Sequence, residues 1–222
     1  MFDEGAKLTL FAIGLAALFV TLVGEKYAPP PEIATAVNTA RLPSLPLRAE
    51  PDGAPAQTAV KAMRVGLAEG FEARLLHGYV IEGRVVTRRE FRYDATSPVS
   101  PLDLGIVWGD LARPGGTDAI EFRTAPRAVW AITPPDAALP ANWSEQVTNN
   151  HLIPANQAVS DALMAIEVGA QVRLRGYLVE VTGDRISTWS SSTRRDDSTI
   201  VGGCEIILVT DVEILPDGET AA

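Results

Sequence analysis

The chain has 222 residues and a formal net charge of −9. This negative charge argues against a nucleic-acid partner, because binding to phosphates needs a positive protein surface. The single cysteine, Cys204, excludes an internal disulfide.

An uncharged, proline-free apolar run covers residues 8–23, and Gly24 lengthens it to the lower limit for a bilayer-spanning helix. We predict a transmembrane anchor at 8–24, behind an N-terminal tail at 1–7. A cleaved secretory signal is the first alternative, but the run lacks a basic stretch before it and a small-residue cleavage site directly after it. A buried soluble helix is the second.

The predicted anchor carries small residues that would let another helix pack closely against it, namely Ala12, Gly14, Ala16 and Ala17. Lys7 and Lys26 nearly balance across the anchor, so the positive-inside rule gives little direction. A short N-terminal tail normally stays in the cytoplasm. We therefore predict a single-pass protein whose C-terminal domain lies outside the cytoplasm.

Residues 25–56 read as a proline-rich tether, since seven of the sixteen prolines fall between residues 29 and 55. Such a stretch has too few apolar residues to form a core and favours extended, semi-rigid backbone. The main interpretation is an unbound spacer. The alternative is a segment that packs along a neighbouring subunit.

We place one globular domain at 57–216 and a flexible tail at 217–222. A short helix is predicted at 59–67, followed by a long strand or hairpin at 71–86, where alternate residues from Tyr79 to Val85 share one face. The basic and aromatic segment at 87–93 indicates an exposed strand face with ion pairs. Contact with RNA or with a lipid headgroup is a lesser alternative for that segment.

A second helix is predicted at 100–111, with Ser100 as its cap, Pro101 at its first position and Asp103 in its first turn. One or two strands follow at 122–132. The loop between them contains Gly115 and Gly116 but lacks the glycine spacing and the lysine of a phosphate-binding loop.

The segment 149–156 is rich in polar residues. Asn156 is placed to cap a helix that runs through Val159 and Leu163 and ends at Gly169. His151 lies beside two apolar residues, which favours a buried histidine bonded to a backbone carbonyl. A general base is the alternative.

The C-terminal part gives the clearest strand signals: a strand at 171–182, a turn at Gly183, a return strand at 186–190, a polar loop at 191–203 and a closing strand at 204–215. Gly176 inside a strand is typical of a strongly bent barrel strand. We predict an α+β, mainly β protein: one N-terminal transmembrane helix plus one small barrel- or sandwich-like domain, OB-like among the options, with two or three short helices.

Five segments in this order resemble a family of uncharacterised, membrane-anchored proteobacterial proteins: GRVVTRREFRYD, SPLDLGIVWG, NNHLIPAN, VGAQVRLRGYLVEV and a loop ending in GCE. The likeness extends over residues 79–212. Ile200 and Val201 depart from it, since small residues usually stand there. The resemblance implies membrane anchoring and supports the domain boundaries, but it implies no activity.

The main functional hypothesis is a non-enzymatic accessory or structural subunit of a larger complex in the bacterial inner membrane, with a periplasmic domain. Its expected partners are other integral-membrane subunits, bound through the helix and tether, and the lipid bilayer. We expect no cofactor and no metal, because two histidines and one cysteine give no ligand spacing.

Two alternatives remain open. A ligand- or anion-sensing module would use the polar loop, and a Cys/His hydrolase or transferase would use Cys204 as nucleophile, His151 as base and Asp196 or Asp197 as the orienting acid. The candidate ligand or partner residues are His151, Ser191, Arg194, Arg195, Asp196, Asp197, Cys204 and Glu205.

Overall fold

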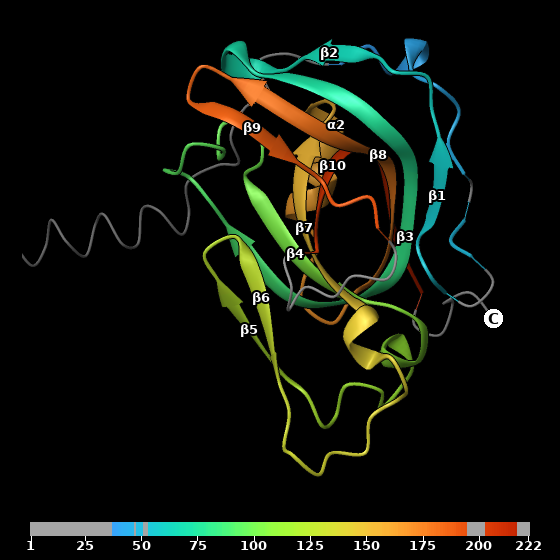
Figure 1. Cartoon of the computed structure of the whole chain (residues 1–222). Helices are drawn as coiled ribbons and strands as arrows, with labels where there is room; N and C mark the ends of the chain where they lie inside the picture. Colours follow the sequence, from blue (N-terminus) through green and yellow to red (C-terminus); the bar gives the residue numbers. More distant parts are fainter. Residues whose placement is uncertain (1–36, 47, 51–52, 195–202, 217–222) are drawn as a thin grey trace, which may run out of the picture. The chain divides into compact units, whose positions relative to one another are not determined.

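The computed structural model describes residues 37–46, 48–50, 53–194 and 203–216 (Figure 1). The chain divides into Met1–Pro31 and Glu32–Ala222, and all described residues belong to the second unit. The predicted tail at 1–7, the anchor at 8–24 and the C-terminal tail at 217–222 lie outside the described residues. Within the described part of the chain, no helix is long and apolar enough to cross a membrane.

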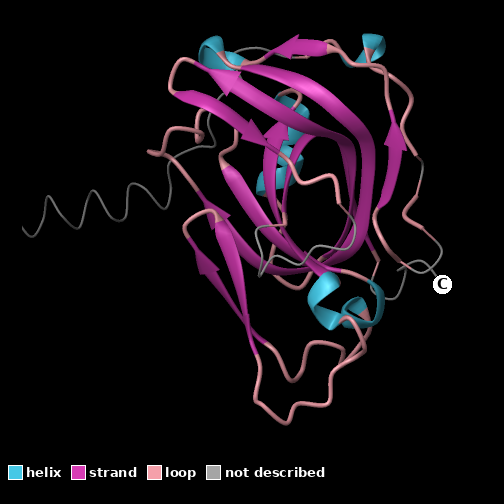
Figure 2. Cartoon of the chain, viewed as in Figure 1, coloured by secondary structure: helices cyan, strands magenta, loops and turns pink. Residues whose placement is uncertain are grey.

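Strands dominate the described residues (Figure 2), which confirms the α+β, mainly β class. One sheet has eight strands: β1 (Ala56–Ala59), β2 (Arg64–Gly66), β3 (Glu72–Glu90), β4 (Leu102–Val107), β7 (Val147–Pro154), β8 (Gln171–Gly183), β9 (Ile186–Ser190) and β10 (Cys204–Leu215). A separate hairpin consists of β5 (Glu121–Ala125) and β6 (Ala128–Ile132). The helical elements are α2 (Gln157–Met164) and the 3₁₀ turns η1 (Thr39–Arg41), η2 (Ala68–Gly70), η3 (Gly109–Ala112) and η4 (Trp143–Glu145).

Five of the strands close into a ring. β3 pairs with β4, β4 with β7, β7 with β10, β10 with β8, and β8 with β3 again. Only β7 and β10 are parallel among these pairs. The first part of the long β3 pairs with β8 and its last part with β4, so one bent strand serves both neighbours.

Alternate residues of the five strands point into the ring and form its core. The same cluster contains Val159 and Leu163 of α2 and Ile166, which follows the helix. Glycines allow close approach between strands at two places. A Cβ atom on Gly176 would lie 2.1 Å from the carbonyl oxygen of Leu208, and one on Gly83 would lie 2.1 Å from that of Val107. The sequence assigned Gly176 to a strand interior, and the neighbouring backbone explains why glycine is needed there.

The prediction of a helix at 100–111 is wrong, because residues 102–107 form β4 and only 109–112 form a 3₁₀ turn. All six residues of β4 are buried, between β3 on one side and β7 on the other. This burial in the sheet outweighs the local capping pattern of Ser100 and Asp103. The helix predicted at 59–67 is also wrong, since that stretch holds the end of β1 and the strand β2.

Other predicted elements are confirmed. Asn156 caps α2 through its Oδ1, which accepts a hydrogen bond from the Val159 amide at 3.0 Å. The predicted end of this helix at Gly169 is wrong, because α2 ends at Met164. The hairpin of β8 and β9 and the closing strand β10 occur where the alternation placed them. The ion pairs predicted near residues 87–93 include Arg88 with Glu90 and Arg92 with Glu90.

Residues 37–46 and 48–50, which we call the strap, lie against the outside of the ring. The Val37 amide donates to the Ala155 carbonyl at 2.8 Å, the Ala49 amide donates to Glu82 Oε1 at 3.1 Å, and the Tyr177 hydroxyl donates to the Pro43 carbonyl. The described part of the predicted tether at 25–56 is therefore packed on the folded unit.

Candidate functional site

A buried polar cluster occupies the outer face of β4 and β7. Asp103 of β4 lies directly opposite His151 of β7 in the strand register. Leu102 and Leu152, one residue along each strand, point into the core instead, so Asp103 and His151 must share the outer face. His151 Nδ1 lies 3.0 Å from Asp103 Oδ1, which is within the distance of an ion pair. The two atoms do not meet the geometric criteria for a hydrogen bond.

Arg127 joins this face from the turn between β5 and β6, where its backbone has a positive φ of 53°. Its Nε donates to Asp94 Oδ2 at 2.9 Å and its Nη2 to Asp94 Oδ1 at 2.9 Å. The remaining contacts are to Asp103 Oδ1 at 2.8 Å, to Ser100 Oγ at 3.3 Å and to the Ser100 carbonyl at 2.9 Å. These five contacts match the five N–H donors of a guanidinium, so no donor remains for a ligand.

Aromatic side chains cover the charged groups. The Arg127 guanidinium lies 3.8 Å from the ring centre of Phe91 and 5.9 Å from that of Trp189. The rings of Trp189 and His151 are 4.9 Å apart. The side chains of Asp103 and His151 are each 4% exposed. We call Phe91, Asp94, Asp103, Arg127, His151 and Trp189 the outer-face cluster.

The charges within this cluster neutralise one another. Burial opposes ionisation of Asp94, but the Arg127 guanidinium and the Thr96 amide and hydroxyl outweigh it and hold the pKa of Asp94 below its ordinary value. Asn149 Nδ2 donates to the other oxygen of Asp103 at 3.4 Å. The arrangement therefore fixes the segment around Asp94 and the β5–β6 turn to the barrel wall.

The structure brings some of the predicted site residues together and separates others. Cys204, half-buried, begins β10 opposite Asn149, on the same face as His151. Glu205 is buried and takes the opposite face, toward the inside of the ring. His151 is buried as predicted, but its neighbour is the Asp103 carboxylate and not a backbone carbonyl.

In the polar loop, the described residues bond to nearby backbone. Ser191 Oγ accepts a hydrogen bond from the Ile206 amide at 3.1 Å, and the amide of the exposed Arg194 donates to Ser192 Oγ at 3.2 Å. Arg195, Asp196 and Asp197 lie outside the described residues. So do the helix-packing candidates Ala12, Gly14, Ala16 and Ala17.

Sequence reasoning missed four members of the outer-face cluster: Phe91, Asp94, Arg127 and Trp189. Asp103 was assigned to a helix start. Arg127 lies 33 residues from Asp94 and 24 from Asp103, and no local pattern connects residues at such separations. The one available signal was a Pro126-Arg127 pair between two predicted strands, which is typical of a turn.

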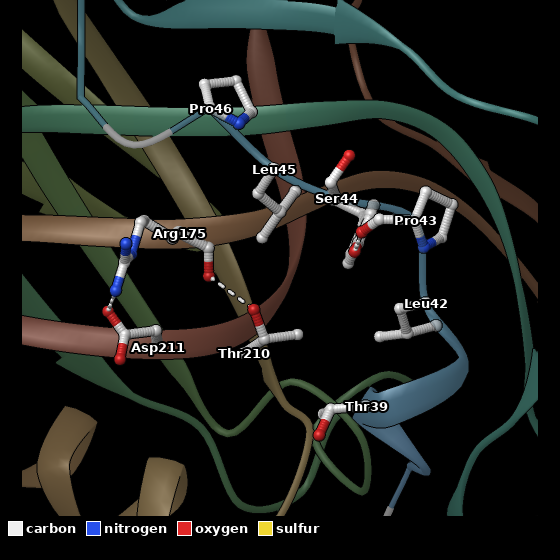
Figure 3. A pocket seen from close by; sticks show the side chains of 10 residues that line it. Thr39, Leu42, Pro43, Ser44, Leu45, Pro46, Arg175, Thr210 and Asp211 are labelled. Atoms are coloured by element: carbon white, nitrogen blue, oxygen red, sulfur yellow. Dashed lines mark hydrogen bonds and ion pairs between the residues drawn. The ribbon is translucent and has the colours of Figure 1, made fainter.

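A groove of about 400 Å³ lies between the strap and the strands β8 and β10 (Figure 3). Leu42, Pro43 and Leu45 line its strap side. On the barrel side, Arg175 pairs with Asp211 at 2.7 Å, and the Thr210 hydroxyl donates to the Arg175 carbonyl at 3.3 Å. Its charged side chains are therefore paired with each other, which does not favour a charged ligand.

Among residues 37–46, 48–50, 53–194 and 203–216, no group of three or more histidine, cysteine or acidic side chains is placed to hold a metal ion. Comparisons with protein-family models, curated proteins and solved structures find no match to this chain. The resemblance to the membrane-anchored proteobacterial family therefore remains a prediction that rests on the sequence motifs.

Proposed function

We propose that the protein is a non-enzymatic accessory subunit of a larger complex in the bacterial inner membrane. The predicted anchor at 8–24 would attach it, and the mainly β domain would be presented at the periplasmic surface. Its partners would be other integral-membrane subunits. The observation that carries this proposal concerns Arg127, the central residue of the outer-face cluster. All five of its hydrogen-bond donors are used within the chain, so none is left for a ligand.

The barrel supports an OB-like interpretation. Its strands follow the chain order β3, β4, β7, β8, β10 and the ring order β3, β4, β7, β10, β8, and α2 lies between its third and fourth strands. OB barrels bind oligonucleotides and oligosaccharides on the face of their second and third strands, between flanking loops. Here that face belongs to β4 and β7 and is filled by the outer-face cluster. A scaffold role fits this closed face better than ligand capture.

The direct test is extraction of the full chain from native membranes in a mild detergent, followed by pull-down on a C-terminal tag and native sizing. We expect a stoichiometric assembly that contains integral-membrane chains. A protein that runs alone at its own mass contradicts the proposal.

Substitution of Gly14, Ala16 and Ala17 by leucine tests the anchor as the attachment point, because larger side chains prevent close helix packing. We expect the variant to stay in the membrane and to lose its co-purifying chains. A control with Ile13→Leu and Val20→Leu changes apolar residues of the same segment and should retain them. Unchanged co-purification of the leucine variant rules out this attachment.

One observation favours a second candidate, a thiol-dependent enzyme. Asp103 and His151 form a carboxylate–imidazole pair, and Cys204 lies on the same face of the next strand. Asp103 would then take the orienting role that the sequence assigned to Asp196 or Asp197. Labelling distinguishes the two functions, because Cys204 is the only thiol: fast labelling of the native protein at low pH supports the enzyme, and protection until unfolding argues against it.

A further inference from the structure

The β5–β6 hairpin presents an exposed apolar face. Val129 and Ala131 of β6 pack toward the barrel, whereas Trp130 and Ile132 alternate with them and point to solvent. Trp130 is 62% exposed and Ile132 39% exposed. Figure 1 shows the hairpin standing beside the barrel, with its turn near β4.

A groove of about 620 Å³ continues this face at the open end of the hairpin. Ile132 belongs to both surfaces, because it lines the groove and also neighbours Trp130 along the exposed face. The other lining residues are Asp118, Ala119, Ile120, Glu121, Thr133 and Pro134. A tryptophan beside an apolar groove is typical of a hot spot, the small part of a protein interface that supplies most of the binding energy.

The hairpin is held in place before any partner binds. Its inner face packs in a cluster with Val107 and Leu111, and Arg127 fixes its turn to Asp94 and Asp103. A preformed surface loses little conformational entropy on binding, so more of the contact energy is left for affinity.

The charge around the groove indicates the chemistry of the partner. Between residues 114 and 141 the acids are Asp118, Glu121 and Asp136, and the only base besides the half-buried Arg127 is Arg123. Arg123 pairs with Glu121 at 2.7 Å with both side chains more than half exposed, so the pair is weak and open to competition. The surface is therefore apolar at its centre and acidic at its rim.

We propose that the solvent face of β5–β6 docks a segment of a partner subunit in which apolar side chains are flanked by lysine or arginine. The apolar side chains would cover Trp130 and fill the groove beside Ile132, and the basic residues would face Asp118 and Glu121. This inference rests on the proposed function and adds the surface and the partner chemistry to it.

The test is site-specific photo-crosslinking of the full chain in its native membranes. A benzophenone amino acid replaces Arg123, which lies opposite Trp130 in the hairpin and leaves Trp130 and Ile132 intact. We expect an adduct whose partner peptide carries apolar residues beside lysine or arginine. Adding Trp130→Ser should lower the adduct yield about tenfold or more, and adding Asp118→Lys with Glu121→Lys should lower it as well. The same probe at Lys61, exposed between β1 and β2, is the matched control.

Several results overturn the docking proposal: no adduct at position 123 although pull-down shows an assembly, an adduct to lipid or to a second copy, a partner peptide without basic residues, or a yield that Trp130→Ser leaves unchanged. In these cases the accessory-subunit function stands and only its surface is wrong. A protein that runs alone in the pull-down contradicts the proposed function itself.

Discussion

The two faces of the β5–β6 hairpin differ more than any other pair of adjacent surfaces described above. The inner face packs against the barrel through Val129, and in the turn Arg127 donates five hydrogen bonds, which go to Asp94, Ser100 and Asp103. The outer face carries Trp130 and Ile132, which contact solvent. Alternation along β6 places Val129 on the covered face and Trp130 on the exposed face. Arg127 in the adjoining turn has no free donor, whereas Trp130 is open to a partner.

Replacing Arg127, on the covered side of the hairpin, should cause the largest loss in the free energy of unfolding. Arg127→Ala leaves the buried Asp103 without its arginine, and removal of one partner of a buried pair costs about 3–5 kcal/mol. Urea denaturation of the full chain in detergent measures the free energy of unfolding. Arg123→Ala, which breaks an exposed pair, is the control and should cost about 1 kcal/mol or less. Equal losses in the two variants would show that the cluster is no more than a surface ion pair.

The contact between the hairpin and the barrel should be the next most sensitive point. A Cβ atom on Gly105 would lie 2.3 Å from Thr87 Oγ1 and 3.1 Å from Val129 Cγ2, so Gly105→Ala pushes against both. We expect a loss of about 1–3 kcal/mol in the free energy of unfolding, as for other overpacked sites. Gly66→Ala, where a Cβ meets nothing within 4 Å, provides the comparison. A neutral Gly105→Ala would indicate that the hairpin is loosely attached.

Low pH should reduce the stability that the Asp94–Arg127 pair contributes. The pKa of Asp94 is lowered in the folded protein, so its contribution to stability is present above its unfolded pKa of about 3.9 and is lost as the pH falls through the folded value. Asp94→Asn should be less stable than the wild type near neutral pH, and the difference should shrink below about pH 4. Denaturation at a series of pH values measures this, and a difference that stays constant down to pH 3 contradicts it.

Trp130→Ser should have the smallest effect on stability, within about 0.5 kcal/mol, because the side chain is mostly in solvent. The same substitution should lower the crosslinking yield from position 123 about tenfold or more. A large loss of stability would mean that Trp130 supports the fold and that the two hairpin faces are not independent.

The sequence predicted the elements whose signal is local. Alternation located β8 and gave the bounds of β10, and the asparagine cap located α2. β4 was missed because it is buried on both faces and so lacks alternation, while Ser100 and Pro101 imitate a helix start. The candidate site was largely hidden from sequence reasoning. Of its members only His151 was singled out for it, since Arg127 meets its acids through contacts between distant segments.

The order in which the ring is joined also bears on how the protein is made. β10 pairs with both β7 and β8 and follows them in the chain, so the ring stays open until β10 has been made. A chain emerging from the ribosome therefore holds four strands that cannot close without the fifth. Such long-range pairing makes folding slow and leaves strand edges uncovered for a time. A newly made chain would thus pass through an interval in which chaperone binding competes with folding.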